Sequence, residues 1–340
     1  YKQYGEQTMD IVRNHPYRLC EMVGIGFRTA DKIAMSMGFD QLSPERVDEG
    51  LLYTLADAEL KGHLCMEKHA FIKQCIKLLD TPELTEEMAA ARAAWLLHNG
   101  RIASYGGQVY RAQTAKAEQN LAYSVRSMLL HGKTGIYGDL QADIPAQEAK
   151  LHITLAPEQQ EAVITALASP VSIITGPGTG KTLIQRVLLN IYKAKHPNAR
   201  ITCCAPTGRA ARRMEQSTGI PATTIHKALG LLAGDDGTYC EPEMLDADLV
   251  LVDETSMMDV YLAGHLFRSL PRGCQLVLIG DADQLPSVGP GAVLSEMIAC
   301  GKIPVIKLDK IYRQSYGSRI PANAKLIRHG NLSLEYGDDF

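Results

Sequence analysis

A glycine-rich stretch, "GPGTGKT" at residues 176–182, carries the lysine and the hydroxyl expected of a phosphate-binding loop. It follows the apolar run "VSIIT" and precedes "LIQRVLL", so the sequence predicts a strand, a tight loop and a helix in that order. Glycines let backbone N–H groups turn inward around phosphate oxygens, and the amino-terminal end of the helix adds positive potential. The residues expected to hold a nucleoside triphosphate are Gly176, Gly178, Thr179, Gly180, Lys181 and Thr182.

Catalytic roles follow from the types of four side chains near this loop. Lys181 would reach the β- and γ-phosphates, and the hydroxyl of Thr182 would ligate Mg²⁺. In "LVLVDETSMMD", about 70 residues later, Asp253 ends an apolar strand and would hold the Mg²⁺ shell through water. Glu254 would polarise the attacking water. Four apolar residues before the acidic pair favour hydrolysis over a pair of solvated acids in a turn.

A third stretch, "VLIGDADQLPSVGPG" at residues 277–291, places an amide just after an apolar strand. Asp281 can cap the end of this strand. Gln284 is a neutral donor and acceptor, so it can contact both the γ-phosphate and the attacking water without repelling either. Such a residue would sense the presence of the γ-phosphate, and the Pro- and Gly-rich loop after it would transmit the change.

The elements that must position these residues form an α/β pattern. Short apolar runs recur at 171–175, 201–205, 249–253, 275–280 and 303–307, each separated from the next by a helix-length segment. Near-continuous apolar strands that alternate with helices predict a parallel sheet covered on both faces.

The first 150 residues instead predict a helical region. Ser43 and Thr85 are expected to cap two helices, the first with Pro44 at its first position and the second ending at residues 99–100. A hairpin is expected around Gly106 and Gly107, and then a helix over residues 115–131. The order helix, hairpin, helix favours a winged-helix-like module. Residues 131–147 are expected to be a linker or loop.

Composition indicates a cytoplasmic protein with no membrane partner. No segment reaches the 18 or so unbroken apolar residues of a membrane span, and no secretory signal begins the chain. The eight cysteines lack metal-ligand spacing, which suits reduced thiols. The net charge of −3 means that any DNA binding must come from local clusters and backbone donors.

In order along the chain, seven motifs resemble those of the RecD/TraA-type branch of superfamily 1 DNA helicases. They are "LAPEQQEAV" (155–163), "GPGTGKT" (176–182), "APTGRAARRM" (205–214), "TTIHKAL" (223–229), "VDETSMMD" (252–259), "GDADQLPSVGPGAVL" (280–294) and "KIYRQ" (310–314). The resemblance, to the alpha subunit of exonuclease V in particular, implies a RecA-like motor domain that uses ATP and Mg²⁺ on single-stranded DNA.

The resemblance also implies residue roles outside the phosphate loop. Gln159 would read the adenine edge, and Arg313 would bind the γ-phosphate from the edge of the domain. The residues that would hold the DNA strand are Thr207, Gly208, Arg209, Thr224 and His226. For the histidine, a buried structural role is the alternative.

The N-terminal stretch "EMVGIGFRTADKIAMSMGF" resembles a helix-hairpin-helix element. Gly24 and Gly26 would free backbone N–H groups to face a DNA phosphate, with Arg28 and Lys32 nearby. The alternative is a plain helix-turn that serves as scaffold. The sequence therefore predicts a helix-hairpin-helix element over 1–40, a winged-helix-like domain over 41–150 and motor domain 1A over 151–340.

Superfamily 1 motors close ATP between two RecA-like domains, and we expect the second domain to be missing from this chain. The leading hypothesis is therefore the N-terminal part of an ATP-dependent helicase. It would move 5′ to 3′ in recombination or double-strand-break repair, alone or with other subunits of an exonuclease V-like complex. One alternative is an ATP-gated DNA-binding switch without unwinding. Another is the helicase part of a conjugative TraA-like protein, although His63, His69 and His98 lack the spacing of its metal cluster.

Overall fold

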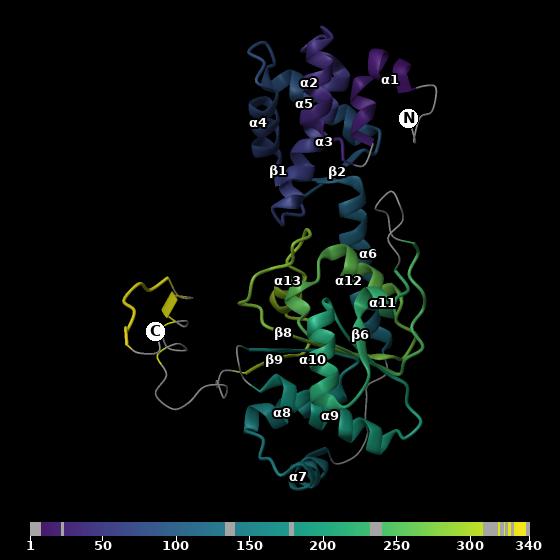
Figure 1. The fold of residues 1–340 in the computed structure, drawn as a ribbon, viewed down its shortest axis with the longest axis vertical. Helices are drawn as coiled ribbons and strands as arrows, with labels where there is room; N and C mark the ends of the chain where they lie inside the picture. Colours follow the sequence, from purple (N-terminus) through teal and green to yellow (C-terminus); the bar gives the residue numbers. More distant parts are fainter. Residues whose placement is uncertain are drawn as a thin grey trace.

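The computed structural model describes residues 8–21, 24–132, 140–176, 180–231, 240–308 and 330–337, with positions 319, 323, 326 and 327. A helical N-terminal part and an α/β part lie at opposite ends of the long axis, and a long helix, α6 (Ala112–His131), runs from one to the other (Figure 1). Among the described helices, none has the length and apolar character to cross a membrane.

Helices dominate the N-terminal part. They are α1 (Thr8–Asn14), the 3-10 helix η2 (Pro16–Glu21), α2 (Phe27–Ser36), α3 (Pro44–Leu60), α4 (Lys68–Leu79) and α5 (Glu86–His98). The predicted caps of α3 and α5 are confirmed, because Ser43 Oγ accepts from the N–H of Arg46 at 3.4 Å and Thr85 Oγ1 from that of Met88 at 3.2 Å. One buried apolar cluster, which extends from Tyr17 to Val109, packs these helices together.

A small antiparallel sheet joins this part to α6. Its strands within the described residues are β1 (Met66–Glu67), β2 (Ile102–Tyr105) and β3 (Gln108–Arg111), in the order β1-β3-β2. The predicted hairpin is confirmed: β2 pairs with β3 across Gly106 and Gly107, which have φ of +57° and +81°. Two successive residues with positive φ are what a tight hairpin turn of the primed type requires.

The α/β part is built on a parallel sheet, as the apolar runs predict. In the described residues its strands follow the order β6-β5-β7-β8-β4-β9. They are β4 (Val171–Thr175), β5 (Ile201–Ala205), β6 (Ala222–Thr224), β7 (Leu249–Val252), β8 (Gln275–Gly280) and β9 (Val305–Lys307). Successive residues of β7 alternate between two separate apolar clusters, so both faces of the sheet are buried.

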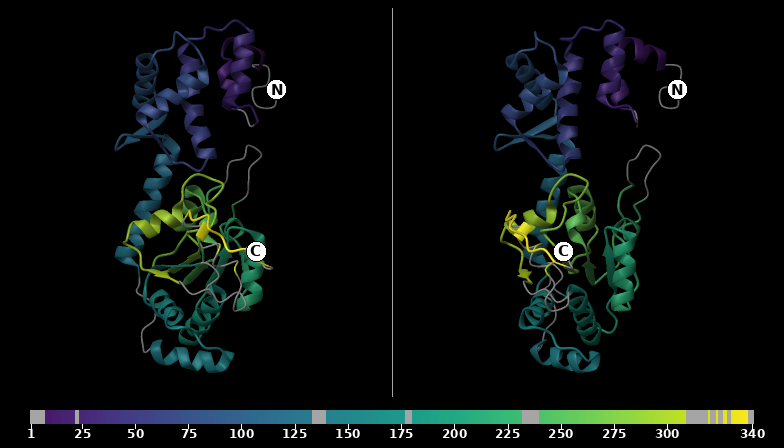
Figure 2. Two further views of the ribbon diagram at one scale, coloured as in Figure 1. Left: turned by 90° about the vertical axis from the view of Figure 1, so that its left-hand side faces the viewer. Right: turned by 60° about the vertical axis from the view of Figure 1, so that its left-hand side comes forward.

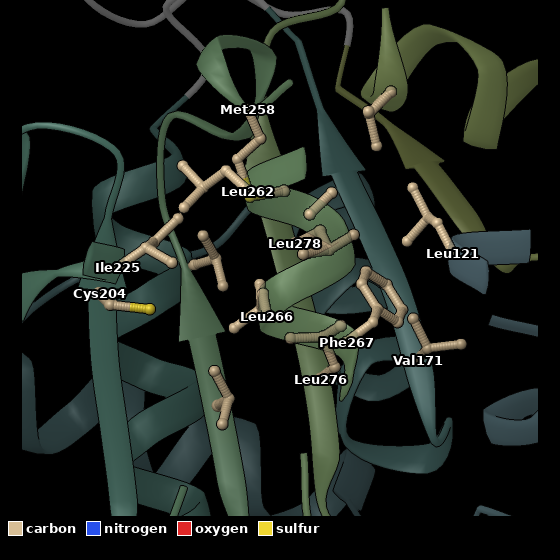
Figure 3. Close-up of a cluster of buried hydrophobic side chains, with 14 of the residues drawn as sticks. Leu121, Val171, Cys204, Ile225, Met258, Leu262, Leu266, Phe267, Leu276 and Leu278 are labelled. Atoms are coloured by element: carbon tan, nitrogen blue, oxygen red, sulfur yellow. The ribbon is translucent and has the colours of Figure 1, made fainter. Parts of the chain in front are cut away.

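Two layers of helices provide those clusters. One face packs against α6, α11 (Ile225–Ala228), α12 (Val260–Arg268) and α13 (Val293–Ala299). Figure 3 shows Leu266 and Phe267 of α12 against Val171, Leu276 and Leu278 of the sheet. The other face packs against α7 (Leu140–Leu151), α8 (Pro157–Ala168), α9 (Lys181–Lys195) and α10 (Gly208–Thr218). Figure 2 shows these two layers from the side.

The expectation of a loop over 131–147 is wrong for its second half. Residues 140–151 form α7, whereas 133–139 lie outside the described residues. Leu140 and Ile144, one helical turn apart, are buried in the same cluster as α8 and α9. Their burial stabilises the helix despite Pro145 in its interior.

A buried polar cluster holds the two parts of the molecule together at the start of α6. The hydroxyl of Thr114 contacts that of Tyr261 on α12 at 2.6 Å and donates to the Glu59 carboxylate at the end of α3. Arg111 donates to the same carboxylate at 2.9 Å. Because a buried carboxylate needs such partners, these bonds join the end of α3 to α12 through the start of α6.

Candidate nucleotide and DNA site

The carboxyl ends of the parallel strands gather most of the predicted site residues at one edge of the sheet. The ends of β4, β7 and β8 lead to the phosphate loop, to the acidic pair and to the loop that carries Gln284, respectively. The ends of β5 and β6, farther along the same edge, lead to the residues predicted to bind DNA. Ligands of open α/β sheets bind in this location, because the loops there are oriented by neighbouring strands.

Both ends of the phosphate loop require glycine. Gly176 has φ of +147°, and a Cβ there would collide with the carbonyl oxygen of Leu308. Gly180 has φ of +80°, and its Cβ would lie 2.7 Å from Nε2 of Gln159. The backbone therefore turns into the helix as the glycine pattern predicts. Gly178 and Thr179 lie outside the described residues.

Lys181 and Thr182 begin α9, where the backbone N–H groups of the first turn point toward the loop. The ammonium group of Lys181 donates to the carbonyl oxygen of Gly176, so the side chain folds over the phosphate loop. Both side chains are half-buried. This places a cation and a hydroxyl at the amino-terminal end of one helix, the arrangement that binds phosphate and its Mg²⁺.

Gln159 lies beside the phosphate loop. It is buried at 4% exposure, and its Oε1 accepts from the N–H of Ala156 at 3.0 Å. That bond directs Nε2 toward Gly180, at the distance noted above. The amide therefore has a donor at the mouth of the loop, where an adenine ring nitrogen could accept from it.

The acidic pair has a strained backbone. Glu254 has φ of +52°, which is uncommon for a residue with a side chain, and its N–H donates to Oδ1 of Asp253 at 2.9 Å. It precedes the 3-10 helix η3 (Thr255–Met257). The left-handed backbone at Glu254 turns its side chain away from that of Asp253. The two predicted roles, metal binding by Asp253 and activation of water by Glu254, require such a difference.

The metal site predicted at Thr182 and Asp253 would be shared between the start of α9, which follows β4, and the residue after β7. Strand β8 lies between β4 and β7, so these two strands are about 10 Å apart at the usual strand spacing. In the described residues no group of three or more His, Cys, Asp or Glu could hold a metal by itself. One hydroxyl and one carboxylate, with water and phosphate oxygens between them, fit Mg²⁺, which usually keeps several waters.

Asp281 shapes the start of the Gln284 loop. It is buried at 4% exposure and accepts from the N–H of Asp283 at 3.1 Å, as the predicted cap of the strand end requires. Nε2 of Gln284 lies 3.5 Å from its Oδ2, a long contact, and the Gln284 residue is exposed. A bond from the N–H of Ala282 to Oγ1 of Thr175, at 3.3 Å, ties this loop to the strand that enters the phosphate loop.

The residues predicted to bind DNA meet at the ends of β5 and β6. Thr207 Oγ1 caps α10 by accepting from the N–H of Ala210 at 3.3 Å, and Thr224 caps α11 in the same way. A Cβ on Gly208 would lie 4.0 Å from the methyl group of Thr224. Because each hydroxyl accepts the capping bond, its own proton can still be donated to a phosphate oxygen.

Two other predicted DNA residues differ in exposure. Arg209 is exposed on the first turn of α10, whereas His226 is half-buried on α11. The half-burial of His226 fits both of its expected roles, DNA contact and structural packing. Arg313 lies outside the described residues.

The predicted N-terminal DNA residues lie far from this edge. Gly24 has φ of +88°, as its place in a hairpin requires, and Gly26 precedes α2. Arg28 and Lys32 are exposed on α2, which Figure 1 shows at the end of the molecule away from the sheet. Ala30 and Ile33 pack into the helical core, as expected of the residues behind the hairpin.

Comparison with known proteins identifies the family. Residues 1–65 match the family described as the ATP-dependent RecD2 DNA helicase HHH domain, and residues 159–290 match an AAA domain family. The ATP-dependent RecD2 DNA helicase of Deinococcus radiodurans is 30% identical over 353 residues, which cover 99% of this chain and 48% of that protein. This chain belongs to the RecD-type helicases.

Other relatives of this RecD-type chain match shorter stretches. The RecBCD enzyme subunit RecD of Haemophilus influenzae is 40% identical over 172 residues, covering 42% of this chain and 27% of that protein. The crystal structure of a Pif1 helicase from Candida albicans is 25% identical, covers 55% of this chain and 46% of that one, and has a TM-score of 0.40. The chain thus spans half or less of the length of these relatives.

Sequence reasoning missed two hydroxyl residues of this RecD-type chain that connect the predicted sites. One is Thr175, described above. The other is Thr255, whose fully buried hydroxyl donates to the carbonyl oxygen of Ile279 at 3.0 Å and so joins the acidic motif to β8. A Cβ on Gly280 would collide with this hydroxyl. The sequence does show a threonine near the end of each of these strands. It does not show that Thr175 bonds to Ala282 or that Thr255 bonds to Ile279.

Proposed function

We propose that this RecD-type chain supplies an ATP- and DNA-binding motor domain to an ATP-dependent helicase. ATP with Mg²⁺ would bind at the ends of β4, β7 and β8, and single-stranded DNA at the ends of β5 and β6. Movement would be 5′ to 3′, in recombination or double-strand-break repair. The Thr175–Ala282 bond carries the proposal, because it physically joins the phosphate loop to the loop predicted to sense the γ-phosphate.

The described side chains suggest how the nucleotide would be handled. On ATP binding, the Lys181 ammonium would exchange its carbonyl partner on Gly176 for phosphate oxygens. Mg²⁺ would neutralise charge on the phosphates, held by Thr182 and, through water, by Asp253. Glu254 would then accept a proton from the attacking water. Loss of the γ-phosphate would remove a hydrogen-bond partner of Gln284, whose loop is bonded to β4.

Two observations on relatives bear on partners. The Haemophilus influenzae relative is named as a RecBCD subunit, so assembly with other subunits of an exonuclease V-like complex is one candidate setting. The Deinococcus radiodurans relative is named as a helicase by itself and matches almost all of this chain. That coverage favours a helicase without those subunits.

ATP turnover with and without single-stranded DNA tests the proposal. We expect strong stimulation by DNA in the protein that contains this chain, and loss of both ATP binding and turnover in Lys181→Ala. Lys193→Ala is the matched control, because Lys193 is exposed at the opposite end of the same helix. ATP binding with no stimulation by DNA would instead favour an ATP-gated switch. Unchanged ATP affinity in Lys181→Ala would refute the phosphate-loop assignment.

A further inference from the structure

A basic groove of about 530 Å³ lies in the helical N-terminal part, away from the sheet. Helices α3 and α4 form its walls, and the start of α2 contributes Arg28. Among the described lining residues, the cations are Arg28, Lys61, Lys73 and Lys77, and the carboxylate is Asp57. The groove therefore has a positive charge, although the chain as a whole carries −3.

Pairing within the groove concentrates that charge on three side chains. Asp57 on α3 and Lys61, the residue just after the end of α3, form an ion pair at 2.5 Å and neutralise each other. In the described part of the chain no carboxylate lies within ion-pair distance of Arg28, Lys73 or Lys77. All three residues are exposed, so they can donate to an anion without first breaking another bond.

The arrangement suits a repeating anion. Lys73 and Lys77 lie on the same face of α4, about 6 Å apart along the helix axis. The phosphates of a nucleic-acid strand recur along its length, and lysine contacts to them carry no sequence information. The groove walls are helices and offer no strand edge to which the backbone of a peptide could add.

One end of the groove lies beside the contact with the α/β part. Lys61 is followed by Gly62, whose carbonyl oxygen accepts a 3.0 Å hydrogen bond from the N–H of Gly291. Gly291 belongs to the loop that also carries Gln284. A DNA strand held along α3 and α4 would therefore lie, at one end, next to the contact between the two parts of the molecule.

We propose that this groove binds the phosphate backbone of DNA, independently of sequence, as a second contact outside the motor's own track. The inference rests on the proposed function, which supplies the DNA. Arg28, Lys73 and Lys77 would each donate to phosphate oxygens. This site differs from the one predicted at the hairpin glycines Gly24 and Gly26. Its cations line a groove between helices, and its phosphate contacts would come from side chains instead of backbone N–H groups.

The test compares DNA binding by charge-neutralised variants of this chain. Binding of a fluorescein-labelled oligothymidine and of a labelled duplex of equal length is measured by anisotropy between 25 and 200 mM salt, values chosen so that electrostatic binding falls steeply across them. The groove variant is Lys73→Gln with Lys77→Gln. Lys68→Gln is the matched control, since Lys68 is exposed on the same helix but does not line the groove. Thermal melting verifies that each variant is folded.

For the groove variant we expect roughly five- to tenfold weaker binding at 50 mM salt. We also expect a slope of log affinity against log salt that is shallower by about 1.4 for a single strand or about 1.8 for a duplex. Lys68→Gln should match the wild type. A loss confined to the oligothymidine assigns the groove to single strands, and a loss confined to the duplex assigns it to duplex DNA.

Two results would overturn the proposal. If the groove variant binds both probes as the wild type does while Arg209→Ala binds them weakly, the groove is not a DNA site and the proposed function stands. If polyglutamate competes with DNA in the wild type and loses affinity by the same factor in the groove variant, the groove is an acidic-peptide site. Absence of DNA binding by the wild type itself would instead sink the proposed function.

Discussion

The backbone N–H of Gly291 donates a hydrogen bond of 3.0 Å to the carbonyl oxygen of Gly62. The bond joins the loop after β8 to the turn after α3, across the boundary between the two parts of the molecule. Leu64 packs at the same place, where its Cδ2 lies 3.2 Å from the position of a Cβ on Gly291. The loop after β8 therefore carries Gln284 near its first end and is bonded to the N-terminal part at its second end, through Gly291.

Gly291→Ala should destabilise the protein by about 1–3 kcal/mol, because Gly291 has φ of +96° and Leu64 leaves little room for a methyl group. The measurement is the shift of the urea unfolding transition. Gly264→Ala is the control, since Gly264 lies in α12 with open space around its Cβ position and should gain about 0.5–1 kcal/mol. Equal shifts in both variants would contradict the strain at Gly291.

Thr175→Val should weaken the coupling between DNA and ATP turnover. The substitution keeps the shape of the side chain but removes the hydroxyl that accepts from Ala282, so the loop loses its tie to β4. We expect DNA stimulation of turnover to fall severalfold while ATP affinity changes little. Thr175→Ser restores the hydroxyl and should restore stimulation. If Thr175→Val is stimulated as strongly as the wild type, the bond does not transmit the nucleotide state.

Glu254→Gln should bind ATP but turn it over at least about 100-fold more slowly, because an amide cannot accept the proton of the attacking water. Rapid-quench measurement of hydrolysis, together with titration of a fluorescent ATP analogue, separates the two steps. Glu161→Gln, an exposed change of the same kind on α8, should leave both unchanged. Wild-type turnover in Glu254→Gln would remove its role as the base.

Arg209→Ala should weaken binding of single-stranded DNA and make its salt dependence shallower by about 0.7, the loss of one phosphate contact. Arg209 is exposed beside Thr207 and Gly208 at the end of β5. Arg186→Ala makes the same charge change on an exposed position of α9 and should keep the wild-type slope. A slope that is unaltered in Arg209→Ala would exclude this arginine from the DNA contact.

Glu118→Gln should stabilise the protein only above about pH 4.5. Burial, and then the nearby carboxylate of Glu296, raise the pKa of Glu118 from its usual 4.5. A raised carboxyl pKa in the folded state means that the stability it contributes is present below 4.5 and is lost as pH rises through the folded pKa. The variant should therefore melt at a higher temperature than the wild type at pH 7, and at the same temperature at pH 4.

The sequence alone determined the local features of this protein. The strands at 171–175, 201–205 and 275–280 have the expected bounds, and Ser43 and Thr85 cap the expected helices. These features depend on side-chain periodicity, on glycine conformation and on hydrogen bonds within a few residues, all of which a short segment contains. The same holds for the glycines at the two ends of the phosphate loop.

Only the tertiary structure decided which of these features meet. The strand order inserts β8 between β4 and β7, and this brings Thr175 to Ala282, 107 positions away in the chain. It also brings Gly62 to Gly291, and it makes a helix of residues 140–151 by burying Leu140 and Ile144. Contacts between distant segments depend on how whole elements pack, and no pattern within either segment encodes its partner.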